Sequence, residues 1–183
     1  LATLGERHAL HRLRITLPHP SSGGDVLHDR FLVSRVSPGG ECTVHDDTFL
    51  PEHLHRALAC LFERWADDEL DGADRRRART IATGLRSNDV VAGRDWDAYR
   101  STLAEDVVQI DNRPAGAGEL HGPDAVVAWI RELDSAAGGL TITTEDVLAA
   151  TSTAVLWRNV TSGQDACGAV QWPSLLAARF DAD

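Results

Sequence analysis

The stretch GRDWDAYRSTLAEDVVQIDNRPAGAGELHGPDA, residues 93–125, decides the fold. Its first part predicts a helix over 96–104, with large apolar and aromatic side chains on one face. The next part alternates in polarity and predicts a strand over 106–112. A loop rich in proline and glycine follows over 113–118, and a second helix begins at Pro123. A helix, a strand and another helix in this order predict an α+β unit.

The sequence on both sides of this stretch extends the same pattern. Upstream, residues 77–93 are predicted to be helical. Downstream, the second helix should run over 123–136, because its apolar residues repeat at helical spacing and glycines follow it. Three long strands are then predicted over 140–149, 153–161 and 167–180. The unit should therefore hold an antiparallel sheet of at least four strands packed on two or three helices.

The first part of the chain has a different pattern. Near-alternating residues predict strands over 6–17, 26–37 and 41–48, which form a meander too small to bury a face alone. A helix is predicted over 51–66, and a polar junction over 67–76. The helix has one apolar stripe that needs a packing partner. The stripe consists of Leu54, Leu58, Leu61, Phe62 and Trp65.

Composition excludes several classes of protein. The net charge of −10 argues against a nucleic-acid partner, because phosphate binding needs a basic surface. No apolar run is long enough to span a membrane, and no signal peptide is recognised. The three cysteines, Cys42, Cys60 and Cys167, show no CxxC spacing, which predicts no zinc site and a cytoplasmic location. The absence of Met suggests that Leu1 lies inside a longer protein.

Four motifs in the deciding stretch carry a family resemblance. They are Gly93-Arg94-Asp95-Trp96-Asp97-Ala98-Tyr99, Leu103-Ala104-Glu105-Asp106-Val107-Val108, Asp111-Asn112-Arg113-Pro114 and Gly118-Glu119-Leu120-His121-Gly122-Pro123-Asp124-Ala125. Together they resemble the SnoaL-like branch of the NTF2-like superfamily, over roughly residues 77–180. The resemblance implies a cone, in which a curved antiparallel sheet wraps round a helix and encloses an apolar pocket.

The resemblance also implies a domain organisation. Residues 1–50 look like the closing strands of a partial first NTF2-like repeat, and 51–76 like its linker helix and junction. Residues 77–183 then form the SnoaL-like domain, which we expect to lack its last strand. The arrangement resembles tandem modules appended to actinobacterial regulatory proteins.

Asp111 is the main candidate for chemistry. It lies at the end of the first strand, on the face opposite Val108 and Ile110. Enzymes that resemble this domain use carboxylates in the pocket, and partial desolvation at the pocket rim would raise the pKa of Asp111. The alternative is that Asp111 opens the loop as a turn or capping residue before Pro114. Resembling domains often carry His at the next position, and Asn112 here cannot exchange a proton near neutral pH.

Other side chains complete a predicted ligand site. Asp146 and Arg158 lie on later strands, where each either points inward or stays on the exposed face. The aromatic residues either line the pocket or pack in the core. The full predicted ligand-binding set is Trp96, Tyr99, Asp111, Arg113, Trp129, Asp146, Trp157 and Arg158. No His, Asp or Glu set has metal-ligand spacing, so we expect no metal and no cofactor.

Three functions are compatible with these features. The favoured one is a non-catalytic module that binds a small apolar ligand or docks a partner inside a larger regulatory protein. The second is an acid/base enzyme of the isomerase, polyketide cyclase or epoxide hydrolase type, with Asp111 as its catalytic base. The third is a structural module that forms a homodimer through the open face of its sheet. None of the three requires a nucleic acid or a membrane.

Overall fold

The computed structural model describes residues 2–18, 21, 23–113, 116–165 and 168–180. Contacts divide the chain into two compact units. Unit 1 comprises Leu1–Leu85, Thr144–Asn159 and Leu175–Asp183, and unit 2 comprises Arg86–Thr143 and Val160–Ser174. One helix and three strands run from one unit into the other, so each unit is described here by its own contacts.

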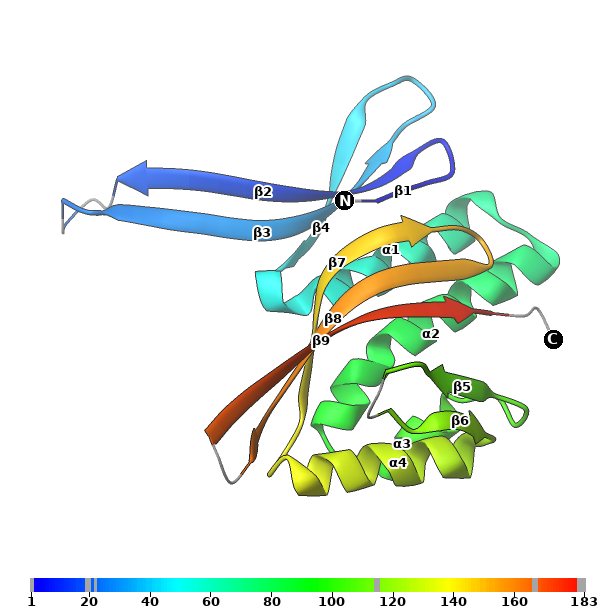
Figure 1. Ribbon diagram of the computed structural model, residues 1–183. Helices are drawn as coiled ribbons and strands as arrows, with labels where there is room; N and C mark the ends of the chain where they lie inside the picture. Colours follow the sequence, from blue (N-terminus) through cyan, green and yellow to red (C-terminus); the bar gives the residue numbers. More distant parts are fainter. Residues whose placement is uncertain (1, 19–20, 22, 114–115, 166–167, 181–183) are drawn as a thin grey trace. The chain divides into compact units, whose positions relative to one another are not determined.

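The first sheet of unit 1 is an antiparallel meander (Figure 1). Its strands follow the order of the sequence: β1 (Thr3–Leu4), β2 (His8–Pro18), β3 (Asp25–Val36) and β4 (Cys42–Phe49). The three strands predicted from alternation are confirmed. β2 and β3 pair over their whole length, from His8 opposite Arg35 to Pro18 opposite Asp25.

A helix covers the base of this sheet. A short 3-10 turn, η1 (Pro51–His53), leads into α1 (Leu54–Glu69), so the predicted helix starts later and ends later than expected. The whole apolar stripe is buried against β2, β3 and β4, as predicted. Burial of large apolar side chains is the main source of stability in this unit. Those side chains are Leu54, Leu58, Leu61, Phe62 and Trp65.

The predicted polar junction over 67–76 is largely helical. The chain is extended only around Leu70, and α2 (Gly72–Ala92) then runs through the predicted domain boundary at residue 77. Gly72 has a φ of +53°, a conformation that favours glycine at this break. Opposite charges in this segment form the ion pairs Arg75–Asp71, Arg77–Asp74 and Arg79–Asp67. That residues 1–50 belong to a first repeat stays a prediction.

Unit 2 begins with the last turns of α2 and contains the deciding stretch. Its elements are α3 (Trp96–Ser101), β5 (Val108–Asp111), β6 (Gly118–His121) and α4 (Pro123–Ala136). Asp95 caps α3 by accepting the N–H of Ala98 at 3.0 Å. α3 ends three residues before the predicted position, because the N–H groups of Thr102 and Leu103 bond three residues back in tighter turns.

α4 matches its predicted bounds, and its end is fixed by local contacts. Gly138 has a φ of +60° after the last turn, as a helix-ending glycine requires. Asp134 accepts the N–H of Leu140 at 2.7 Å and the Nε–H of Arg94 at 2.9 Å. The first bond joins the end of α4 to the residue before the next strand, and the second joins it to the segment between α2 and α3. The buried residues of the helix are Pro123, Val126, Val127 and Ile130, whereas Leu133, which was also expected to face the core, is half-buried.

The last three strands form their own sheet. β7 (Thr141–Ala150), β8 (Ala154–Asp165) and β9 (Gly168–Arg179) are neighbours in this order (Figure 1). Among the described residues, β5 and β6 pair only with each other. The prediction of one sheet with at least four strands over 77–180 is therefore wrong, because the short hairpin before α4 does not join the later strands. The α+β class is confirmed. No helix in the described part of the chain is long and apolar enough to cross a membrane.

Candidate functional site

Asp111 is the last residue of β5, where it pairs with Gly118 of β6. Its side chain is only 8% exposed, whereas Val108 and Ile110 on the other face of the strand are exposed. The predicted alternation is confirmed. Asp111 therefore points to the covered side of the hairpin, where its carboxylate needs hydrogen-bond partners.

The partners of Asp111 come from the loop that follows it. The guanidinium of Arg113 donates two parallel bonds, from Nε to Oδ1 at 2.8 Å and from Nη2 to Oδ2 at 2.6 Å. The backbone N–H of Arg113 also donates to Oδ1 at 3.2 Å, and the backbone N–H of Ala117 donates to the same carboxylate. Paired bonds of this kind are strong and directional. Asp111 thus organises its loop, as the alternative interpretation of this residue expected.

Gly116 makes this arrangement possible. A Cβ atom at this position would collide with the carboxyl group of Asp111. The backbone of the loop can approach the carboxylate only because residue 116 has no side chain. The sequence predicted a loop in this region, but no sequence pattern indicated that Gly116 is needed for contact with Asp111.

The charge state of Asp111 follows from these contacts. The hydrogen bonds from the Arg113 side chain lower the pKa of Asp111 from an ordinary 3.8 to about 2, and they outweigh the opposing effect of burial. The expected rise in the pKa of Asp111 is therefore wrong. Arg113 compensates the desolvation that would have raised it. A carboxylate with such a low pKa is ionised at neutral pH and is a weak base.

Aromatic side chains lie on the two helices α3 and α4 of unit 2. The Arg113 guanidinium lies over the ring of Trp129 on α4, 5.9 Å from its centroid. Trp96 and Tyr99 are half-buried on α3, which packs against α4. Burial raises the pKa of the Tyr99 hydroxyl. Asp111, Arg113 and Trp129 thus form one connected cluster, which we call the Asp111 cluster.

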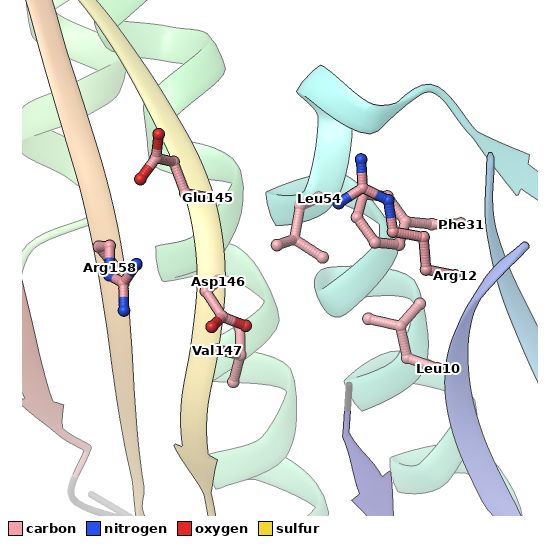
Figure 2. A pocket seen from close by; sticks show the side chains of 8 residues that line it. All are labelled: Leu10, Arg12, Phe31, Leu54, Glu145, Asp146, Val147 and Arg158. Carbon is pink, nitrogen blue, oxygen red and sulfur yellow. The ribbon is translucent and has the colours of Figure 1, made fainter. Parts of the chain in front are cut away.

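A separate hollow of about 280 Å³ lies in unit 1 (Figure 2). Two of the predicted ligand residues, Asp146 on β7 and Arg158 on β8, line it. Arg158 is exposed, and Asp146 is half-buried. The hollow is mixed in polarity and open to solvent. Its lining consists of Leu10, Arg12, Phe31, Leu54, Glu145, Asp146, Val147 and Arg158.

The structure thus distributes the predicted ligand residues over two units. Trp96, Tyr99 and the three residues of the Asp111 cluster belong to unit 2. The other three belong to unit 1, where Trp157 packs against the core beside the buried Val155. Asp111 pairs with Arg113 of the same unit. The Asp111 cluster is therefore the part of the prediction that the contacts bring together.

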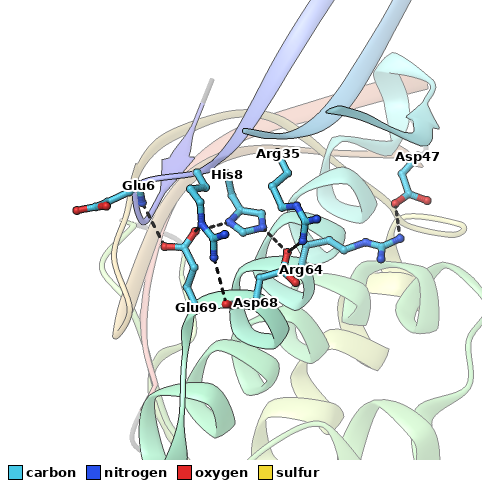
Figure 3. Close-up of polar contacts among 8 residues, drawn as sticks. Glu6, His8, Arg35, Asp47, Arg64, Asp68 and Glu69 are labelled. Atoms are coloured by element: carbon cyan, nitrogen blue, oxygen red, sulfur yellow. Dashed lines mark hydrogen bonds and ion pairs between the residues drawn. The ribbon is translucent and has the colours of Figure 1, made fainter. Parts of the chain in front are cut away.

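A second polar cluster was missed by sequence analysis (Figure 3). The buried ring of His8 on β2 contacts two carboxylates at the end of α1, with Nδ1 2.7 Å from Glu69 Oε1 and Nε2 3.0 Å from Asp68 Oδ2. Arg35 donates to Asp68 at 2.8 Å, and the pKa of Asp68 is lowered although burial opposes this. The acidic run at 67–69 lies in the segment that was predicted to be a polar junction. It joins the helix to the sheet, and no local sequence pattern predicts contacts between residues about sixty positions apart.

No metal site is built by the described residues. Among them, no group of three or more His, Cys, Asp or Glu side chains has an arrangement that could hold a metal ion. His121, the one histidine of the deciding stretch, is exposed and pairs with Glu119 at 2.9 Å. Cys60 is buried beside Asp47, and burial followed by the hydrogen bond to that carboxylate raises the pKa of its thiol to about 11. Such a thiol is a poor nucleophile.

Comparison with solved structures gives neighbours of low sequence identity. Bal32a from a soil-derived mobile gene cassette is 15% identical with a TM-score of 0.50, covering 60% of this chain and 83% of its own. RV0760c from Mycobacterium tuberculosis, in complex with estradiol-17beta-hemisuccinate, is 20% identical with a TM-score of 0.45, covering 55% and 82%. Delta 5-3-ketosteroid isomerase from Mycobacterium sp. is 20% identical with a TM-score of 0.44, covering 56% and 82%.

The family itself is identified by sequence. No protein with a curated description matches the chain significantly. The family model described as SnoaL-like domain matches residues 85–181, which is more than half of the chain. This range contains the Asp111 cluster and all the strands from β5 to β9. The chain therefore belongs to the SnoaL-like domain family.

Proposed function

We propose that the SnoaL-like domain of this chain binds a small apolar molecule in a regulatory role and does not carry out acid/base turnover. The proposal has two parts, a site that binds and a carboxylate that does not react. The Asp111 cluster supports both, because it combines an aromatic surface with a carboxylate that already has its partners.

The paired bonds between Arg113 and Asp111 are the observation that carries the proposal. A general base needs a pKa close to the working pH and a lone pair directed at the substrate. The carboxylate of Asp111 accepts three bonds from Arg113 and one from Ala117, and its pKa is about 2. Asn112 beside it cannot take over the proton transfer. The enzyme alternative would require Arg113 to release Asp111 when substrate binds.

Aromatic side chains support the binding part of the proposal. Trp129, Trp96 and Tyr99 are half-buried, so each keeps part of its apolar surface available. Half-buried aromatic surface beside a few fixed polar groups is typical of sites for small molecules. Arg113 contributes a fixed cation at the edge of this surface, where it would orient a polar end of an otherwise apolar ligand.

The test uses the whole chain and two probes, a 3-oxo-Δ5-steroid and limonene epoxide. Thermal shift measures binding, and product formation measures isomerase or epoxide hydrolase turnover. We expect at least one probe to stabilise the protein, Trp129→Leu to weaken that effect, and neither probe to be turned over. Trp172→Leu is the matched control, because Trp172 is an exposed tryptophan on β9.

The same assay separates the alternatives. If the unmodified protein turns over a probe and Asp111→Asn abolishes the turnover, the non-catalytic part of the proposal is wrong. If neither probe changes the thermal stability, or if Trp172→Leu has the same effect as Trp129→Leu, the binding part is wrong.

A further inference from the structure

The ring of His8 lies between two carboxylates, and both of its nitrogens contact them (Figure 3). Nδ1 lies 2.7 Å from Oε1 of Glu69, and Nε2 lies 3.0 Å from Oδ2 of Asp68. The side chain of His8 is fully buried, so protein groups must satisfy both nitrogens. A neutral imidazole has one N–H donor and one acceptor nitrogen, whereas an ionised carboxylate only accepts. A neutral ring would therefore direct a lone pair at one of the two carboxylates.

Other donors hold both carboxylates in the ionised form. Burial alone would raise the pKa of Asp68, but hydrogen bonds lower it, first among them the bond that Arg35 of β3 donates to Oδ2 at 2.8 Å. Glu69 accepts the backbone N–H of Glu6 on Oε2 at 3.3 Å, and Nε of Arg7 lies 3.6 Å from its Oε1. With both partners ionised, only an imidazolium ring supplies the two N–H groups that the geometry requires.

The charges around the ring come from three parts of unit 1. Asp68 and Glu69 at the end of α1 contact the ring and favour a positive charge on it. Arg35 of β3 and Arg7 before β2 disfavour that charge, but they contact the carboxylates. The two carboxylates therefore dominate, because they lie closest to the ring and act in a buried place where Coulomb attraction is strong. A buried cation is stable only with partners of this kind.

We propose that His8, Asp68 and Glu69 form a pH-sensitive latch, in which the ring carries both protons in the folded protein at neutral pH and loss of one proton weakens the attachment of α1 to β2. In the unfolded chain the ring is in water and lacks the two carboxylates, so the folded protein binds this proton more tightly. Unfolding therefore releases a proton. The contribution of the latch to the free energy of unfolding is full below about pH 6.5, where an exposed histidine is protonated, and it is lost as the pH rises.

Deprotonation would act where several elements of unit 1 meet. α1 ends at Glu69, and the chain is extended at Leu70 before α2 begins at Gly72. Glu69 also accepts the N–H of Glu6, which lies between β1 and β2. A neutral ring keeps one donor, so one of the two carboxylates loses its bond and faces a lone pair. The latch thus links proton uptake to the packing of the first sheet on α1.

The protonation state of the ring is the first test. Long-range proton–nitrogen NMR of the whole unmodified chain, assigned through the backbone, distinguishes protonated from unprotonated ring nitrogens and needs no variant. At about pH 7.5, we expect both nitrogens of His8 to be protonated. His28, an exposed histidine on β3, is the internal control and should show mostly the neutral ring. One protonated and one unprotonated nitrogen in His8 at this pH would overturn the proposal.

Replacement of one carboxylate tests the link to stability. Glu69→Gln places an amide group beside the ring, and this group can donate a hydrogen bond to a neutral imidazole. Urea unfolding should show the folding equilibrium constant of the unmodified chain falling between about pH 6.5 and about pH 9 by about tenfold more than that of Glu69→Gln. Glu52→Gln removes the charge of an exposed glutamate in η1 and should keep the pH dependence of the unmodified chain. The same pH dependence in Glu69→Gln as in the unmodified chain would show that the ring proton does not control the latch, and the proposal would be wrong.

Discussion

The Arg113 guanidinium binds both carboxylate oxygens of Asp111, two residues before it in the chain, at 2.8 and 2.6 Å. The contact closes the loop after β5 and keeps the carboxylate ionised. Sequence analysis gave Asp111 two interpretations, a catalytic base and a turn or capping residue at the start of the loop. The bonds from Arg113 support the second interpretation, which the proposed function adopts.

The first prediction concerns the stability of the protein in acid. The pKa of Asp111 is lowered in the folded protein, so its contribution to the free energy of unfolding is fully present above its unfolded pKa. The contribution should be lost as the pH falls from about 4 towards about 2. Urea unfolding at several pH values measures it. The difference between the unmodified protein and Asp111→Asn should shrink over this range, and a constant difference would contradict the assignment.

The second prediction concerns Gly116. A methyl group here collides with the carboxyl group of Asp111, so Gly116→Ala should lower the free energy of unfolding by about 1–3 kcal/mol. Gly93→Ala is the matched control, because a Cβ there meets its neighbours at ordinary contact distances of 3.4 to 3.5 Å. The effect of Gly116→Ala should largely disappear in an Asp111→Ala background. Equal costs in both backgrounds would show that the two residues are not coupled.

The third prediction concerns the attachment of β2 to α1. The His8 ring is fully buried between Asp68 and Glu69. Replacing the ring by an apolar side chain would leave each of these two partly buried carboxylates without one of its partners. His8→Leu should lower the free energy of unfolding by about 3 kcal/mol. Arg64→Ala breaks a more exposed pair with Asp47 in the same unit and should cost about 1 kcal/mol or less. Similar costs for the two variants would contradict a structural role for His8.

Much of the fold was predictable because local signals were strong. α4 begins at the Gly122-Pro123 pair and ends before Gly138, and both ends match the prediction. The strands of the meander followed from alternation. The sheet arrangement was not predictable, since nothing in the four residues of β5 indicates that they pair only with β6. Helix α2 begins at Gly72, just after the break, and runs without interruption past the boundary expected at residue 77.

The candidate site was predictable only in part. Alternation correctly placed Asp111 opposite Val108 and Ile110, and the neighbouring Arg113 was expected to be in contact. The direction of the pKa shift of Asp111 was not predictable, because it depends on loop geometry that brings one side chain and two backbone N–H groups to one carboxylate. The hollow in unit 1 depends on residues from five separate elements, which no sequence spacing relates.

The central claim is that Asp111 is an anchor that is ionised at neutral pH and not a base, and its own titration tests this most directly. Carbon NMR of the side-chain carboxyl, recorded against pH, should give a pKa of about 2 in the unmodified protein. In Arg113→Gln the pKa should rise to near or above the ordinary 3.8, while Arg131→Gln, an exposed arginine on α4, should leave it unchanged. A pKa above 3.8 in the unmodified protein would contradict the account and restore Asp111 as a candidate base.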